Sequence, residues 1–261
     1  DLGADVVIHS GTKYLSGHND TLAGFIVTNR EDIQEKLRFL IKTTGAGLAP
    51  FDCWLVLRGI KTLGIRMDRS QENAMEIAKW LRAQKYVTKV IYPGFEDHPG
   101  HEIMKRQSRG YGAMLTFQVE NKDFALGILG KVRMIRFAES LGGVETLLTY
   151  PTTQTHADVP KEIQEKNGLT DATLRMSVGI ENVKDLIAEL DRVFREIENE
   201  QLLTALETLK TEDLEIITMY AYEGYDITEI SKVYGVSRPT ISIKIKRITK
   251  FLKNFNFNAT N

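Results

Sequence analysis

The sequence predicts an α/β region followed by a separate all-α module. Up to about residue 198, short apolar runs typical of buried strands alternate with amphipathic helical patterns, the order expected for a layered α/β domain. From residue 199 onward only helical patterns remain. We therefore expect the α/β region to comprise residues 1–60 and 61–198, and the helical module to comprise residues 199–261.

Strands and helices are expected to alternate along the α/β region. Val6–Ile8 is predicted to be a buried strand, and a second strand is expected at 22–27. A helix over 31–42 takes Asn29 as its N-cap and should bury Ile33, Leu37, Leu40 and Ile41. Further strands are expected at 86–92, 113–119, 135–138 and 174–178, and further helices at 51–84, 122–129 and 183–197. The helix at 51–84 should bend near Gly59 or Gly64.

The last sixty residues contain the pattern of a helix, a tight turn and a second helix. Gly235 suits a left-handed turn, Ser237 an N-cap and Pro239 the first helical turn. The expected helices are 202–209, 211–223, 227–234 and 237–255, and the tail 254–258 is expected to fray. The predicted shared core consists of Ile230, Val233, Val236, Ile241 and Ile245.

Composition excludes several classes of protein. The 261 residues carry a formal charge of −1, so no overall charge attracts the chain to nucleic acid or to a membrane. A single cysteine, Cys53, excludes an internal disulfide framework and fits a reducing cytoplasm. No apolar run approaches the roughly 20 residues that span a bilayer. Because the chain opens at Asp1 close to a predicted strand, we expect it to lack the N-terminal part of a larger protein.

A group of small and hydroxyl residues around one lysine follows the first strand. Ser10 and Thr12 supply hydroxyls, Gly11 allows close approach of the backbone, and Lys13 supplies an amine. These groups suit a ligand that carries a phosphate beside a carbonyl, because hydroxyls bind the phosphate and an amine can react with the carbonyl. The pattern taken alone favours a polar loop that carries a solvated lysine.

The amino-acid sequences of this segment and of five later blocks resemble those of the Cys/Met-metabolism family of pyridoxal phosphate enzymes. The blocks occur in family order at 10–25, 50–63, 92–101, 139–146, 155–157 and 174–181. The resemblance implies a fold-type-I transferase with pyridoxal 5'-phosphate as cofactor, small amino-acid substrates and a cytoplasmic homo-oligomer. In these terms, residues 1–60 are the end of the cofactor-binding large domain and residues 61–198 are the small C-terminal domain.

The resemblance also implies roles for individual residues. Lys13 matches the lysine that holds the cofactor covalently and later moves protons, and Ser10 and Thr12 match the phosphate ligands. Arg175 matches the arginine that pairs with the substrate α-carboxylate, although a structural ion pair is the alternative. The other substrate-site residues implied are Glu139, Ser140, Leu141 and Thr155. The histidines have no spacing typical of metal ligands, and His98 and His101 are interpreted as loop residues.

The implied reaction is transsulfuration. Residues 149–160 are most similar to synthase-like members, which favours cystathionine γ-synthase chemistry: cysteine replaces the γ-substituent of an activated homoserine ester. Cystathionine β-lyase and γ-lyase remain alternatives. Several family contacts to the cofactor lie upstream of the lysine and have no counterpart here, so we expect the 261-residue chain to be a poor enzyme.

Residues 206–252 resemble the helix-turn-helix domain of bacterial sigma factors, which implies binding to duplex DNA. Between Lys232 and Lys253 there are seven basic residues and no acidic one. The residues expected to contact DNA are Arg238, Thr240, Lys244, Lys246, Arg247 and Lys250. Two alternatives remain open: a packing module with a solvated basic face, and a regulator in which the enzyme part is only a scaffold.

Overall fold

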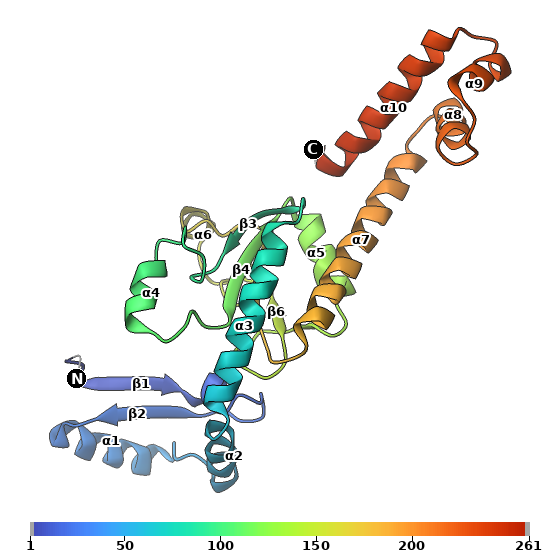
Figure 1. The fold of residues 1–261 in the computed structure, drawn as a ribbon. Coiled ribbons are helices and arrows are strands. Elements are labelled where there is room, and N and C mark those ends of the chain that lie inside the picture. The colour runs from blue at the N-terminus through green and yellow to red at the C-terminus, as the bar shows by residue number, and fades with distance from the viewer. Residues whose placement is uncertain (1–2, 259–261) are drawn as a thin grey trace. The chain divides into compact units, whose positions relative to one another are not determined.

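The computed structural model describes residues 3–258, with side chains described as far as residue 252. The chain forms two compact units that divide between Leu190 and Asp191 (Figure 1). The first unit contains both sheets, and the second is entirely helical. The predicted order of an α/β region before an all-α module is therefore confirmed.

The first unit opens with a two-stranded antiparallel sheet of β1 (Val6–Ser10) and β2 (Gly24–Thr28). Residues 11–23 connect the two strands and begin with the short helical segment η1 (Gly11–Leu15). Helix α1 (Glu31–Thr44) follows β2 (Figure 1). The prediction that Val6–Ile8 is buried is wrong: all of β1 is exposed, and the side chain of Ile8 is 74% exposed. A two-stranded sheet is buried on both faces only if other elements cover each face. Among the described elements, none covers the second face of this pair.

Helix α1 also differs from the sequence-based expectation. It begins after Arg30, whose side chain caps nothing, so Asn29 is not the N-cap. Of the residues expected to face inward, Leu40 and Ile41 are exposed. The amphipathic pattern is present, but the apolar stripe is wider than the surface that β2 offers.

The helix predicted over 51–84 is divided into α2 (Pro50–Ile60) and α3 (Leu63–Arg82). The break at Lys61 and Thr62 follows the expected weak point at Gly59. Gly59 is needed because a Cβ atom there would lie 2.2 Å from the carbonyl oxygen of Ser16. The end of α2 is thus packed against the backbone that follows η1.

The larger sheet has five strands in the order β3-β4-β7-β6-β5, of which only β5 and β6 are parallel. The strands are β3 (Val87–Ile91), β4 (Met114–Val119), β5 (Arg136–Phe137), β6 (Leu147–Thr149) and β7 (Thr173–Ser177). Helices α3 and α5 (Lys122–Lys131) pack against it (Figure 1). The core includes Ile77, Phe117, Phe124, Leu174 and Met176, all fully buried. Because β7 is central, residues at its C-terminal end lie deep in the unit.

Three short elements were not predicted: α4 (His101–Gln107), β6 and α6 (Lys161–Lys166). Each is too short for a helical or strand period to stand out in the sequence. His101 is not a loop residue but the first residue of α4. It is buried, its Nδ1 lies 2.9 Å from the carbonyl oxygen of Pro93, and its ring stacks on Tyr111.

The division between the two units falls within α7 (Val183–Glu207), so the helical unit begins with most of this helix. Helix α7 extends beyond the predicted end at 197 and includes most of the helix expected at 202–209. The helical unit continues with α8 (Thr211–Ala221), α9 (Ile227–Val233) and α10 (Arg238–Asn258). Helix α10 includes the tail expected to fray. The predicted turn is confirmed, since Gly235 has φ +65° and Ser237 accepts a hydrogen bond from the backbone N–H of Thr240.

The core of the helical unit differs in part from the predicted set. Its fully buried residues are Ile216, Ile230, Ile241, Ile245 and Ile248. Val233 and Val236 were expected in this core but are exposed. Ile216 from α8 and Ile248 from the middle of α10 are buried in their place, so the packing includes three helices rather than the two of the motif. No helix within the described residues is long and apolar enough to cross a membrane.

Candidate active site

Lys13 lies at the centre of η1, the lysine turn (Gly11–Leu15), at the start of the connection between β1 and β2. Its backbone departs from helical geometry, with φ −90° and ψ −127°. The preceding residue, Thr12, is tied to Ala23: its hydroxyl donates to the Ala23 carbonyl oxygen at 3.3 Å and accepts from the Ala23 N–H at 2.9 Å. These bonds anchor the backbone immediately before the lysine, while the Lys13 side chain remains partly exposed.

Gly11 permits the close approach of this turn to β2. A Cβ atom at Gly11 would lie 2.5 Å from the ring of Phe25 and 2.8 Å from the Cβ atom of Ala23. Ser10 is exposed at the end of β1, directly before this contact. The hydroxyl of Ser10 is therefore open to a ligand, whereas the hydroxyl of Thr12 is already hydrogen bonded to the main chain.

The loop after β5 lies against the lysine turn, although about 130 residues separate them in sequence. A Cβ atom at Gly142 would lie 2.8 Å from the backbone nitrogen of Tyr14 and 3.1 Å from the carbonyl carbon of Lys13. The Gly142 N–H also donates to Ser177 Oγ, at the end of β7, at 2.8 Å. Three segments predicted separately from sequence thus converge: the lysine turn, the 139–146 block and the 174–181 block.

Ser140 and Thr12 line one cavity of about 540 Å³. Its other lining residues are Asn19, Asp20, Thr21, Leu22 and Asp52. Leu141, the next residue in the same loop, is partly buried. The structure thus brings Ser140 and Leu141 beside the lysine turn.

Arg175 lies on the central strand β7, opposite Thr116 on one side and Thr149 on the other. Its guanidinium donates to Thr149 Oγ1 at 3.3 Å, while its Nε is buried without a hydrogen-bond partner. Burial lowers the pKa of Arg175 from its ordinary value, and the nearby Glu139 carboxylate opposes that shift. An arginine with an unused, buried donor is suited to a carboxylate ligand.

Thr155 is less clearly part of the site. It lies in the turns that follow β6, and its hydroxyl is 2.8 Å from Nδ1 of its neighbour His156. None of the contacts described for Thr155 reaches the lysine turn or Arg175.

Sequence reasoning also overlooked Arg66, a buried arginine on α3 that contacts the lysine turn.

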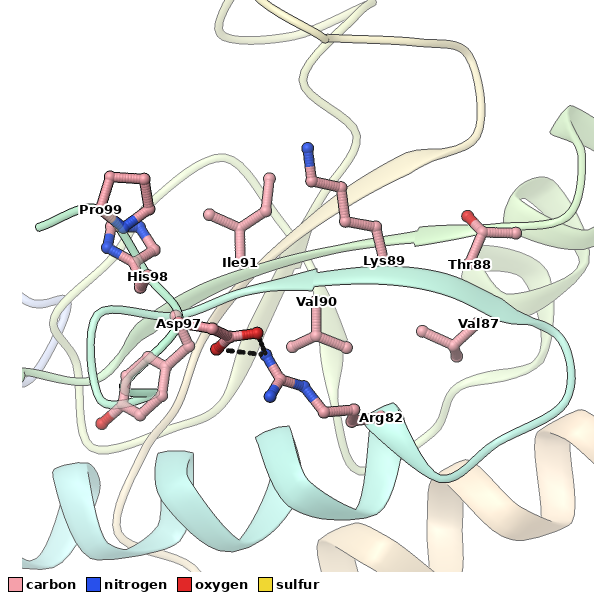
Figure 2. A pocket seen from close by; sticks show the side chains of 10 residues that line it. Arg82, Val87, Thr88, Lys89, Val90, Ile91, Asp97, His98 and Pro99 are labelled. Carbon is pink, nitrogen blue, oxygen red and sulfur yellow. Dashed lines mark hydrogen bonds and ion pairs between the residues drawn. The ribbon is translucent and has the colours of Figure 1, made fainter. Parts of the chain in front are cut away.

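A separate cavity of about 610 Å³ runs along the edge strand β3 (Figure 2). Figure 2 shows Arg82 directed toward Asp97, to which it donates hydrogen bonds of 3.1 and 3.2 Å. The same guanidinium lies 3.6 Å from the centre of the Phe95 ring. Because no candidate site residue lines it, this cavity is separate from the lysine turn.

Pyridoxal phosphate fits the donor set around Lys13. The turn offers a partly exposed amine, Ser10 is exposed three residues before it in the chain, and the unused Nε of Arg175 is suited to the carboxylate of an amino-acid substrate. Within the described residues, no three His, Cys, Asp or Glu side chains are arranged to hold a metal ion.

Two of the six residues expected to contact DNA are engaged in ion pairs within the helical unit. Lys244 pairs with Glu212, and Arg247 donates to both oxygens of Asp213 at 2.8 and 2.7 Å. Thr240 shares a hydroxyl–hydroxyl hydrogen bond with Ser237. Arg238, Lys246 and Lys250 are exposed. The acidic residues in the first turn of α8 thus form ion pairs with part of the basic surface of α10.

Comparison with known proteins identifies the class to which this fold and site belong. The family model for Cys/Met metabolism PLP-dependent enzymes matches residues 1–195, and the chain belongs to this family. A second model, sigma-70 region 4, matches residues 199–252. The cofactor of the family is pyridoxal phosphate.

Relatives with three different activities are similar to this chain. It is 47% identical to a cystathionine gamma-lyase of Dictyostelium discoideum over 193 residues, covering 74% of this chain and 50% of that protein. It is 45% identical to a cystathionine beta-lyase of Lactococcus lactis (72% and 50% covered) and to a cystathionine gamma-synthase of Haemophilus influenzae (74% and 48%). The chain therefore spans about half the length of the curated relatives it matches.

Solved structures agree with this assignment. The crystal structure of cystathionine gamma synthase from Xanthomonas oryzae, in complex with aminoacrylate and cysteine, has a TM-score of 0.71 and 38% identity, covering 76% of this chain and 51% of that one. Cystathionine gamma-lyase from Lactobacillus plantarum, complexed with L-serine, has a TM-score of 0.70 and 40% identity, covering 75% and 51%. The sequence-based assignment of the fold to this family is confirmed.

Proposed function

We propose that this chain carries the lysine and the carboxylate-binding part of a transsulfuration enzyme that acts by γ-replacement, as a cystathionine γ-synthase does. Its substrates would be an activated homoserine ester and cysteine. The observation that carries the proposal is the convergence of the Lys13 turn, the loop at Ser140 and the end of the strand that bears Arg175.

Lys13 is the residue assigned to proton movement. When bound, pyridoxal phosphate supplies an electron sink for the negative charge that develops at the substrate α-carbon. The Lys13 amine would hold the cofactor, with Ser10 and Thr12 at its phosphate, and would then remove the proton from the α-carbon. Thr12 contributes chiefly through the backbone, because its hydroxyl is occupied by Ala23.

Arg175 is assigned to orientation of the substrate. Its guanidinium would donate two parallel hydrogen bonds to the α-carboxylate, which fixes the α-carbon relative to Lys13. Ser140 and Leu141 would support this carboxylate, and Thr155 would line the site. Glu139 interacts electrostatically with Arg175 and would lie near the amino group or the distal chain of the substrate.

The choice among γ-synthase, β-lyase and γ-lyase activity rests on one segment of the sequence. The relatives include γ-lyases, β-lyases and a γ-synthase at similar identity. The preference for γ-synthase comes from the sequence at 149–160. Mass spectrometry of the products tests it: the small amount of product that forms from the homoserine ester and cysteine should be cystathionine. Pyruvate and homocysteine formed from cystathionine would indicate β-lyase, and 2-oxobutanoate with cysteine would indicate γ-lyase.

Covalent labelling tests the proposal directly. The 261-residue chain is incubated with pyridoxal phosphate and reduced with borohydride, and its peptides are analysed by mass spectrometry. The pyridoxyl group should be found on Lys13 and should be lost from that peptide in Lys13→Ala. Labelling spread evenly over the surface lysines, with no preference for Lys13, would contradict the assignment.

A second candidate function belongs to the helical unit alone. Its turn at Gly235 and the exposed cations Arg238, Lys246 and Lys250 favour contact with the phosphates of duplex DNA. The match to sigma-70 region 4 supports the same proposal. A regulator without catalysis would bind duplex DNA but leave Lys13 unlabelled.

A further inference from the structure

Arg66 donates hydrogen bonds to the backbone of the lysine turn, and the proposed function assigns it no role. It lies in the first turn of α3 and is only 6% exposed. Its guanidinium donates to the carbonyl oxygens of Tyr14 at 2.8 Å, Leu15 at 3.3 Å and Gly59 at 2.9 Å, and its Nε donates to Thr62 Oγ1 at 3.1 Å. All three carbonyl groups belong to backbone that ends a turn or a helix.

Arg66 is not held by an ion pair. Among the described residues no carboxylate is paired with it, and burial lowers the pKa of its guanidinium from the ordinary value. A buried cation without a counter-ion is costly and is tolerated only where its donors are well satisfied. Here carbonyl oxygens satisfy them, and two of these follow Lys13 directly in the chain.

Two glycines make room for this arrangement. A Cβ atom at Gly17, which has φ +71°, would lie 2.0 Å from Nη1 of Arg66. A Cβ atom at Gly59 would lie 2.2 Å from the Ser16 carbonyl oxygen. The backbone after Lys13 is therefore packed against both the guanidinium and the end of α2, with no space for a side chain at either contact.

We propose that Arg66 is a positioning residue for Lys13. Thr12 anchors the backbone before the lysine through Ala23, and Arg66 anchors the backbone after it through Tyr14 and Leu15. With both flanks fixed, the Lys13 amine has a restricted range of positions, which favours its reaction with a bound carbonyl over that of other lysines. The proposal rests on the proposed function of Lys13.

The first measurement is amide hydrogen exchange in the 261-residue chain, which needs no cofactor. Ser16 donates its N–H to Gly11 and Gly17 donates its N–H to Lys13, so both amides report the order of the turn. Arg66→Gln should speed their exchange about tenfold or more, since hydrogen bonds to a charged group are lost. Arg69→Gln, an exposed arginine of the same helix, is the matched control and should leave both amides unchanged.

The second measurement is the share of pyridoxyl label that falls on Lys13 after incubation with pyridoxal phosphate and reduction with borohydride. Arg66→Gln should lower the Lys13 share severalfold and raise the share on surface lysines. Ile77→Val removes a buried methylene from α3 and serves as the stability control, because a general loss of stability should not redistribute the label. If Arg66→Gln does not fold, Thr62→Val removes the acceptor of Nε together with the hydrogen bond that the Thr62 hydroxyl donates to the Gly59 carbonyl oxygen, and Thr62→Ser, which keeps both bonds, is its control.

The outcomes separate the two proposals. Unchanged exchange at Ser16 and Gly17 in Arg66→Gln, or in Thr62→Val where that variant takes its place, overturns the inference. Faster exchange with an unchanged Lys13 share also overturns it, because Arg66 would then be structural only. If the unsubstituted chain carries no label on Lys13, the proposed function fails and the positioning role fails with it, whereas the exchange data still report whether Arg66 orders the turn.

Discussion

At the scale of single residues, Arg175 offers the clearest test of substrate binding. Arg175→Lys replaces a planar fork of donors by one ammonium group and should weaken binding of L-cystathionine by about 2 kcal/mol or more. Calorimetric titration of the 261-residue chain measures the change, with Arg136→Lys on the exposed strand β5 as control. Equal affinities for Arg175→Lys and the unsubstituted chain would favour the structural ion-pair interpretation.

Gly142 tests the contact between the loop after β5 and the lysine turn. Gly142→Ala would place a methyl group 2.8 Å from the Tyr14 nitrogen and force a side chain into φ +79°. We expect a loss of about 1–3 kcal/mol in the free energy of unfolding. Gly168→Ala is the matched control, because Gly168 has φ +73° and open space around it. Denaturant unfolding of both variants isolates the steric part, and equal losses would argue against the contact.

Sequence alone predicted Lys13, Ser140 and Arg175 as parts of one site because each lies in a sequence motif that is specific to the family. It did not predict Arg66 or the role of Gly142. A buried arginine that binds carbonyl oxygens has no characteristic spacing, and a glycine required by a contact 130 residues away resembles any loop glycine. Such residues become visible only when the backbones that they join are known.

At the scale of elements, strand and helix order was predictable, whereas burial was not. The apolar run Val6–Ile8 does form a strand, but the strand is exposed. Hydrophobic periodicity indicates which face of an element is suited to packing, and it does not indicate whether a packing partner is present. The break between α2 and α3 was anticipated near Gly59 or Gly64 from the glycines alone, and it lies between them, at Lys61 and Thr62. Its cause, the close approach of Ser16, requires the fold.

Helix α10 supplies a prediction at this scale. Lys250 is exposed, whereas Lys244 is paired with Glu212. If the helical unit binds duplex DNA, Lys250→Ala should weaken binding to all sequences alike and reduce the slope of log affinity against log salt by about 0.9. Lys244→Ala should change that slope by less, because its ammonium already has a carboxylate partner.

Fluorescence anisotropy with random and promoter-like duplexes at several salt concentrations measures both slopes. A larger effect of Lys244→Ala than of Lys250→Ala would show that the Glu212 pair opens on DNA. No binding by the unsubstituted chain at low salt would leave the packing-module interpretation of the helical unit.

At the scale of the whole molecule, the chain combines the residues of the candidate site with a first sheet that leaves apolar side chains exposed. The chain has the lysine, the arginine and a complete five-stranded sheet, yet it spans about half the length of the relatives it matches. Its first sheet leaves Ile8, Ile26 and Val27 exposed. Apolar strand faces of this kind are usually covered by another layer.

We therefore predict that the isolated 261-residue chain forms the bond between Lys13 and the cofactor but turns over substrate poorly. The described residues supply an amine and the arginine that we propose to bind the substrate carboxylate, and we expect these to suffice for labelling and for substrate contact. They supply no identified acidic partner for the cofactor ring nitrogen, on which its capacity to accept electrons depends. Assays with cystathionine, and with homoserine esters plus cysteine, should give little product at saturating pyridoxal phosphate. Robust turnover by the purified chain would contradict this prediction and would require that a second copy or an unrecognised residue completes the site.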